Sequence, residues 1–108
     1  MANKKVHVFD ADGEYRVHPP LIELDGGVPD TLIVRNNTSE DLVIYVGAKA
    51  FNANDPVAVP IPQGKKVNLI AVSQGGGGAS NAYAYQVIAP KSGKKAKGNS
   101  DPVLIIEN

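Results

Sequence analysis

The residues best suited to chemistry in this sequence are its two histidines, His7 and His18. They flank an Asp-Gly pair at positions 12–13, which is typical of a two-residue hairpin turn. A turn centred on that pair places His7 directly opposite His18 on neighbouring strands. Two imidazoles, with Asp10 or Asp12 as a third ligand, could hold Zn²⁺ or Cu²⁺ weakly. The alternative interpretation is a pair of solvated surface histidines.

Other catalytic chemistry has little support in the composition. The 108 residues include no cysteine, which excludes a thiolate nucleophile, a disulfide scaffold and cysteine-ligated metal centres. The serines lie in turn-like segments, without the histidine and acid that a serine triad needs beside its nucleophile. We therefore expect no enzymatic activity and no cofactor.

The elements that position these residues are expected to be short β-strands. Glycine and proline are spread along the chain between runs of β-branched and aromatic residues. Their spacing of roughly 8–12 residues predicts an all-β, antiparallel sandwich or barrel with about eight strands. A turn or two of helix is expected only over residues 48–54. The four consecutive glycines at 75–78 are expected to form a flexible connection.

Two strands carry expectations about their faces. The run 42–46 (Leu-Val-Ile-Tyr-Val) is apolar throughout, which is typical of a strand covered on both faces. Alternation over 82–88 places Tyr83, Tyr85 and Val87 together on one face of the other strand.

Prolines indicate where sheets end, because proline cannot donate a hydrogen bond to a strand ladder. The pair Pro19-Pro20 is expected to mark a sheet edge or a switch between sheets. The strand over 57–61 contains Pro60 and is expected at an edge.

The length allows one domain, which we expect to span residues 1–108. The first ten residues lack the apolar run of a signal peptide, and no segment approaches the ~18 apolar residues of a membrane span. The sequence as written therefore predicts a soluble, cytoplasmic protein. It predicts a periplasmic or extracellular protein if Met1 begins a trimmed chain.

The formal net charge is zero, from 11 basic and 11 acidic residues. A neutral domain has no overall field to attract nucleic acid or an anionic membrane, so we expect neither as a partner. The charge is unevenly distributed: residues 1–55 hold nine acids and five bases, and residues 56–108 hold two acids and six bases. This opposition, with strand edges expected near Pro60 and Val103, favours a homo-oligomer as one alternative.

Two segments resemble the small blue copper proteins, the cupredoxins. The first contains Gly26-Gly27, the strand 30–37 (Asp-Thr-Leu-Ile-Val-Arg-Asn-Asn) and, after a polar turn, the strand 42–46. The second contains the alternating aromatic strand 81–87 (Asn-Ala-Tyr-Ala-Tyr-Gln-Val), a loop and the strand 103–106. The resemblance covers most of the chain and implies a Greek-key β-sandwich of cupredoxin type.

The same resemblance implies that the copper ligands are missing. The position of the first copper histidine falls on Leu42, that of the cysteine on Val87, and that of the next histidine near Pro90. The loop 91–100 contains no methionine. Leucine, valine and proline side chains bind no metal, whereas a blue copper centre needs two imidazoles and a thiolate.

Our leading hypothesis is a non-enzymatic, copper-free cupredoxin-like domain that acts as a protein-interaction or structural module. Its partner would be an unknown protein or a second copy of the chain, and a weak metal site at His7 and His18 is an alternative function. By analogy with the family, the contact surface is expected in the loops where copper would lie. Those loops carry Asn36, Asn37, Glu40 and Asp41, and the lysines Lys91, Lys94, Lys95 and Lys97.

Overall fold

The computed structural model describes residues 2–27, 30–47, 57–71, 80–98 and 102–107. Within them the chain forms nine strands and no helix, which confirms the all-β prediction. The strands are β1 (Asn3–Ala11), β2 (Glu14–His18), β3 (Leu21–Asp25), β4 (Thr31–Asn37), β5 (Leu42–Val46), β6 (Val57–Ile61), β7 (Lys66–Ile70), β8 (Ser80–Ile88) and β9 (Val103–Glu107).

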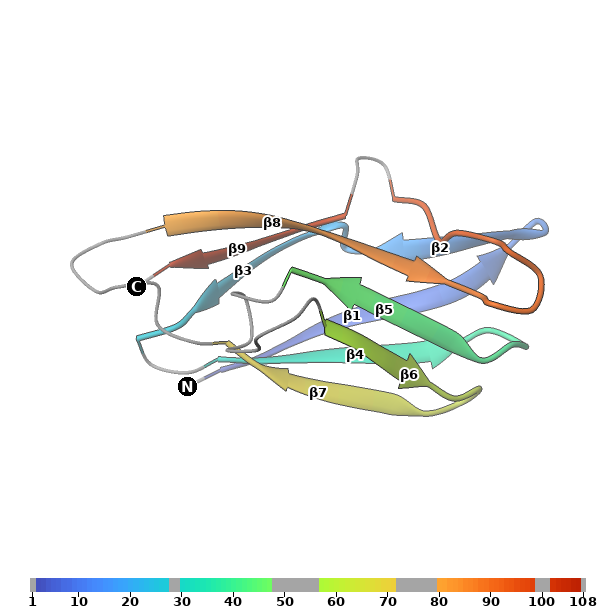
Figure 1. The fold of residues 1–108 in the computed structure, drawn as a ribbon, viewed down its shortest axis with the longest axis horizontal. Coiled ribbons are helices and arrows are strands. Elements are labelled where there is room, and N and C mark those ends of the chain that lie inside the picture. The colour runs from blue at the N-terminus through green and yellow to red at the C-terminus, as the bar shows by residue number, and fades with distance from the viewer. Residues whose placement is uncertain (1, 28–29, 48–56, 72–79, 99–101, 108) are drawn as a thin grey trace.

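The strands form two sheets that pack face to face (Figure 1). One sheet has four strands in the order β2-β1-β4-β7, and the other has five in the order β3-β9-β8-β5-β6. The β1–β4 and β3–β9 pairs are parallel and the remaining pairs are antiparallel. The sandwich is therefore mixed, where the turn-rich sequence predicted antiparallel sheets. The difference arises because β4 and β9 return beside strands that are distant in sequence.

The β1–β2 hairpin has the turn that the Asp-Gly pair predicts. The φ angles of Asp12 and Gly13 are 53° and 82°, which is the left-handed region that a type I′ turn needs at both central positions. The backbone N–H of Gly13 donates to Oδ1 of Asp10 at 3.2 Å. The resulting register pairs His7 with His18, as predicted for a turn centred on positions 12–13.

Alternating residues of both sheets point inward and form one apolar core. On β8 the inward positions are Tyr83, Tyr85 and Val87, which confirms the alternation predicted for this strand. The fully buried side chains include Leu32 and Ile44, one from each sheet. Because two sheet faces share one core, each strand has a second face that is directed outward.

The structure corrects two expectations about strand environments. The run 42–46 forms β5, but only one of its faces is covered, since Tyr45 is 41% exposed. Val103 begins β9, which lies between β3 and β8 and is hydrogen-bonded on both sides, so no free edge occurs there.

The proline-based expectations are confirmed. Pro60 lies in β6, at the edge of the five-stranded sheet. The pair Pro19-Pro20 joins β2, at the edge of one sheet, to β3, at the edge of the other. The helical turn expected over 48–54 and the glycine run at 75–78 lie outside the described residues.

No helix in the described ranges has the length and apolar character needed to cross a bilayer.

Asp30 ties together three segments near the start of β4. Its carboxylate accepts hydrogen bonds from the backbone N–H groups of Asp25, at 2.9 Å, and Ala2, at 2.7 Å. These bonds, the one from Asp25 first, lower the pKa of the Asp30 carboxyl because they stabilise its charged form.

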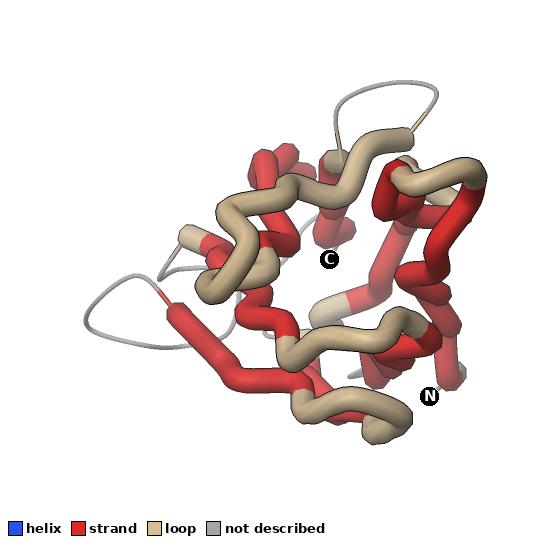
Figure 2. Tube along the Cα trace, turned by 90° about the vertical axis from the view of Figure 1, so that its right-hand side faces the viewer, coloured by secondary structure: helices blue, strands red, loops and turns tan. Residues whose placement is uncertain are grey.

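Four connections gather at the opposite end of the sandwich, which faces the viewer in Figure 2. They are residues 12–13, 38–41, 62–65 and 89–98, and we call this region the loop end. It contains the loops in which the sequence analysis expects the contact surface.

Tyr85 offers a stability test of the core, because its buried hydroxyl has no hydrogen-bond partner in the described structure. Burial raises the pKa of this hydroxyl well above its usual range. We expect Tyr85→Phe to leave the free energy of unfolding unchanged or to raise it by about 1 kcal/mol, since no bond is lost and a desolvated group is removed. Tyr85→Ala, which opens a cavity, should cost about 3–5 kcal/mol.

Urea denaturation of the two variants separates the ring from the hydroxyl. A loss of more than about 1 kcal/mol in Tyr85→Phe would show that the hydroxyl has a partner and would contradict this description.

Candidate functional site

Two of the positions that the resemblance assigns to copper ligands are buried among apolar side chains, whereas Pro90, near the third, is exposed. Leu42 at the start of β5 is 1% exposed, and Val87 near the end of β8 is fully buried. Ala89 and Ala96, in the neighbouring loop, are buried in the same cluster. The N–H of Ala96 donates to the carbonyl of Val87 at 2.8 Å, so the returning loop is fixed directly over this strand.

Asn36 organises two of the loops from inside the protein. It is fully buried, and its Nδ2 donates to the carbonyls of Glu40, at 2.7 Å, and Ile61, at 2.8 Å. Its Oδ1 accepts from the N–H and the hydroxyl of Thr38. All of its side-chain hydrogen-bonding groups are therefore engaged within the chain. Asn36 is predicted to contact a partner, but it is buried and its hydrogen bonds instead stabilise the conformation of the loops.

A polar network lies on the surface of the loop end. The hydroxyl of Tyr15 donates a short hydrogen bond to Oε2 of Glu40, and the same oxygen accepts from Oγ of Ser92 at 3.0 Å. Lys94 Nζ lies 5.1 Å from the centre of the Tyr15 ring and donates to the carbonyl of Gly13 at 3.2 Å. The hydrogen bond from Tyr15, followed by that from Ser92 and the positive field of Lys94, lowers the pKa of Glu40. The same bond to Glu40 raises the pKa of Tyr15.

The two predicted contact loops therefore do meet in space. Residues 38–41 are bonded to residues 90–98 through Glu40 and Ser92, and the backbone of Lys97 pairs with β2. The lysines at positions 91, 94, 95 and 97 are all exposed. Lys91 and Lys94 act on Glu40 of the same chain, so part of the charge opposition between the two halves is compensated within one molecule.

The two histidines lie on the outer face of the four-stranded sheet. Both are exposed and directly paired. Asp10 is the predicted third ligand. Side chains two residues apart on a strand share a face, so Asp10 points to the same face as Val8 and away from that of His7. In the described ranges no three of the histidine, aspartate and glutamate side chains gather in a way that could hold a metal ion. The two-histidine site remains a prediction.

A second candidate surface is the outer face of the five-stranded sheet, which the sequence analysis missed. The register places Val43 between Ile88 and Pro60, and Tyr45 between Gln86 and Ala58. Up to Ile105 on β9 and from Ala82 on β8, the outward side chains that the structure describes on four adjacent strands are uncharged: Val43, Tyr45, Ala58, Pro60, Ala82, Ala84, Gln86, Ile88, Val103 and Ile105. We call this set the uncharged face. The sequence feature that could have revealed this face is the apolar run 42–46, which fits an exposed apolar face as well as burial on both faces.

The architecture is similar to that of solved copper proteins. A mutant of amicyanin in its Cu(I) form matches with a TM-score of 0.55 and 10% identity, over 95% of this chain and 82% of that chain. Auracyanin B matches with a TM-score of 0.56 and 14% identity, over 98% and 88%. A multicopper oxidase from Campylobacter jejuni matches with 0.57 and 17%, over 96% of this chain and 25% of the oxidase. No protein-family model and no curated protein matches the sequence.

The strand arrangement and these matches define a cupredoxin-like β-sandwich. The chain is a cupredoxin-like domain that lacks the copper ligands: the sequence contains no cysteine, and the described residues contain no group of side chains that could hold a metal ion.

The Tyr15–Glu40 bond predicts a specific loss of stability in acid. A carboxyl whose pKa is lowered by folding stabilises the protein above its unfolded pKa of about 4.3, and this contribution is lost as the pH falls through the folded value. Asp30 contributes with the same sign. Wild type should therefore lose stability between neutral pH and about pH 3, and Glu40→Gln should lose less, because the amide can accept the hydrogen bond at every pH.

Urea midpoints measured across this pH range test the expectation, with Glu23→Gln on the other sheet as the matched control. Identical pH profiles for wild type and Glu40→Gln would contradict the assigned role of Glu40.

Proposed function

We propose that this chain is a copper-independent, non-enzymatic protein-interaction domain. The observation that carries the proposal is the uncharged face, which extends over four adjacent strands of a sheet, and no other described element packs against its outer side. Contiguous apolar surface of this kind is uncommon on isolated proteins and marks sites of association. Tyr45, near its middle, is an amphipathic aromatic residue of the type enriched at contact centres.

The chemistry of the partner follows from this face and its border. A partner needs an apolar surface to cover Val43 and Tyr45. On β3, which forms the edge of the sheet, the outward residue Glu23 pairs with Ile105 and places a negative charge beside the face. A basic residue at the rim of the partner's apolar patch would complement it. The proposed occupant is therefore a protein surface that is apolar in its middle and basic at one side.

Site-specific photo-cross-linking in the source cells tests this proposal against the loop-end hypothesis. A photoreactive residue is placed at position 45 in one variant and at position 91, in the lysine-rich loop, in the matched control. We expect a discrete adduct from position 45, and excess wild-type protein should reduce it by competing for the partner. Excess Tyr45→Lys protein should not reduce it, because its affinity for the partner should be at least about tenfold lower. The adduct mass distinguishes a different protein from a second copy. Adducts from position 91 alone would assign the contact to the loops, and none from either position would reject an interaction function.

A second candidate function is weak binding of a divalent metal, favoured by the direct pairing of His7 and His18. Two neighbouring imidazoles are a common arrangement for Zn²⁺ or Cu²⁺. The surroundings limit the affinity, because Lys5, Arg35 and Lys66 line a shallow hollow that includes His7. Calorimetric titration with ZnCl₂ should show at most weak binding that the His7→Ala/His18→Ala double variant abolishes. Unchanged affinity in that variant would reject the site.

A further inference from the structure

The outer face of the four-stranded sheet carries a continuous row of basic side chains. The register pairs His18 with His7, His7 with Arg35, and Arg35 with Lys66, so each of four adjacent strands supplies one member. All four residues are exposed. At a strand spacing of about 4.8 Å, this basic row is roughly 14 Å long.

The basic row is locally unfavourable for the sheet. Like charges placed directly opposite each other on neighbouring strands destabilise the pairing. Arg35 and Lys66 form such a like-charge pair, and the ion pair between Arg16 and Glu14 lies outside the row. A local arrangement that opposes folding is expected where the residues serve a ligand.

The side chains around Arg35 form a hollow rather than a flat surface. A depression of about 70 Å³ is lined by Lys5, His7, Ile33, Arg35 and Lys66. Ile33 points outward, yet it is only 9% exposed and is absent from the core cluster. It is therefore the apolar floor of a depression with basic side chains at its rim. This volume is several times the roughly 10–15 Å³ that one water molecule needs on the same measure, so the hollow has room for one small oxyanion.

Arg35 is held in a fixed orientation at this rim. Its Nε donates to Oδ1 of Asn37 at 3.2 Å, and Nδ2 of Asn37 lies 3.4 Å from Nδ1 of His7. The bond at Nε fixes the guanidinium plane, while the two terminal nitrogens have no hydrogen-bond partner among the described residues. A guanidinium in this state can bind an oxyanion through two parallel hydrogen bonds.

We propose that this hollow binds a phosphate group, with Arg35 as the bidentate donor and Lys5 and Lys66 as the flanking charges. None of these three positive charges has an ion-pair partner among the described residues, and together they match a phosphate of charge about −1.5 to −2 better than a single carboxylate. The proposal is independent of the interaction function, because the uncharged face belongs to the other sheet.

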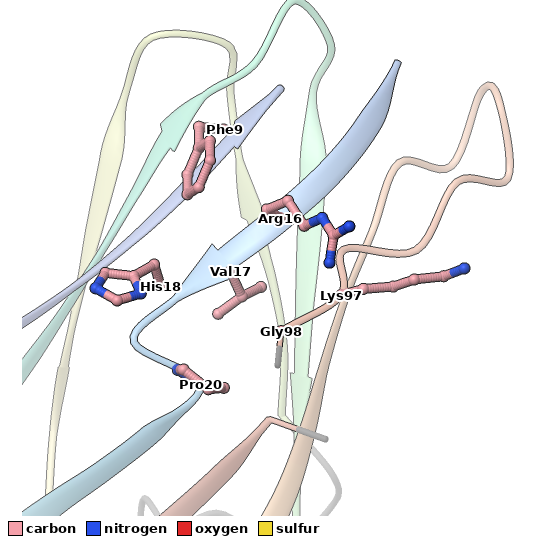
Figure 3. A pocket seen from close by; sticks show the side chains of 7 residues that line it. All are labelled: Phe9, Arg16, Val17, His18, Pro20, Lys97 and Gly98. Carbon is pink, nitrogen blue, oxygen red and sulfur yellow. The ribbon is translucent and has the colours of Figure 1, made fainter. Parts of the chain in front are cut away.

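The face extends beyond the hollow toward β2. There a pocket of about 210 Å³ is lined by Phe9, Arg16, His18 and Lys97, among others, and Figure 3 shows the Arg16 and Lys97 side chains extending in the same direction. Arg16 pairs with Phe9 on one side and with Lys97 on the other. A phosphate-bearing ligand larger than phosphate itself would find further positive charge and one aromatic ring along this face.

Titration of the isotope-labelled protein with pyrophosphate, followed by backbone amide NMR, tests the proposal. We expect saturable shifts on β1, β4 and β7 around the hollow, absent in sodium chloride of equal ionic strength. Arg35→Gln should weaken binding at least about tenfold, whereas Lys95→Gln, an equal charge change at the loop end, should leave it unchanged. A second readout is thermal unfolding, in which pyrophosphate should stabilise wild type more than Arg35→Gln.

A parallel titration with a short single-stranded oligonucleotide identifies the source of the phosphate. If the oligonucleotide shifts the same residues and binds more tightly than pyrophosphate, the proposal holds and the natural ligand is a phosphodiester chain. If pyrophosphate binds and the oligonucleotide binds more weakly or not at all, the proposal holds and the natural ligand is a small phosphorylated molecule. Unsaturable shifts, shifts reproduced by chloride, or equal affinity in Arg35→Gln would overturn it.

Discussion

Apolar packing at the loop end is the constraint on which the rest of this structure depends. Leu42 and Val87, at two positions where the cupredoxin resemblance places copper ligands, are buried in one cluster with the neighbouring Ala89 and Ala96. Buried aliphatic contacts stabilise the region without coordinating anything. The surrounding loops are then fixed by hydrogen bonds of the chain itself, chiefly those of Asn36 and of Tyr15 with Glu40. These contacts join the loops of this end through groups of the chain itself.

The outer faces of the two sheets carry different kinds of side chains. The five-stranded sheet presents uncharged residues around Val43 and Tyr45, and the four-stranded sheet presents the basic row centred on Arg35. A formal net charge of zero conceals this difference, because acidic residues elsewhere balance the basic row. Function is therefore assigned from the faces and their neighbours, since the fold alone is compatible with many functions.

Much of the fold follows from local sequence patterns, and the surfaces do not. The Asp-Gly turn sets the hairpin register, the prolines locate sheet edges, and alternation on β8 identifies the inward tyrosines. The parallel β1–β4 pairing brings together Arg35 and His7, which are distant in sequence, so no local pattern reveals the basic row. For β5, an apolar run fits either burial on both faces or an exposed apolar face, and only the layer order separates the two. The burial of Asn36 likewise depends on long-range contacts with Ile61.

The most direct test of the central claim is native mass spectrometry of the purified protein after incubation with copper and desalting. We expect the metal-free mass for wild type. If wild type retains a weakly bound copper ion, the His7→Ala/His18→Ala variant should not retain it. One copper ion per chain retained by both proteins would show a metal centre at the loop end or elsewhere, and would contradict the conclusion that apolar packing has replaced it.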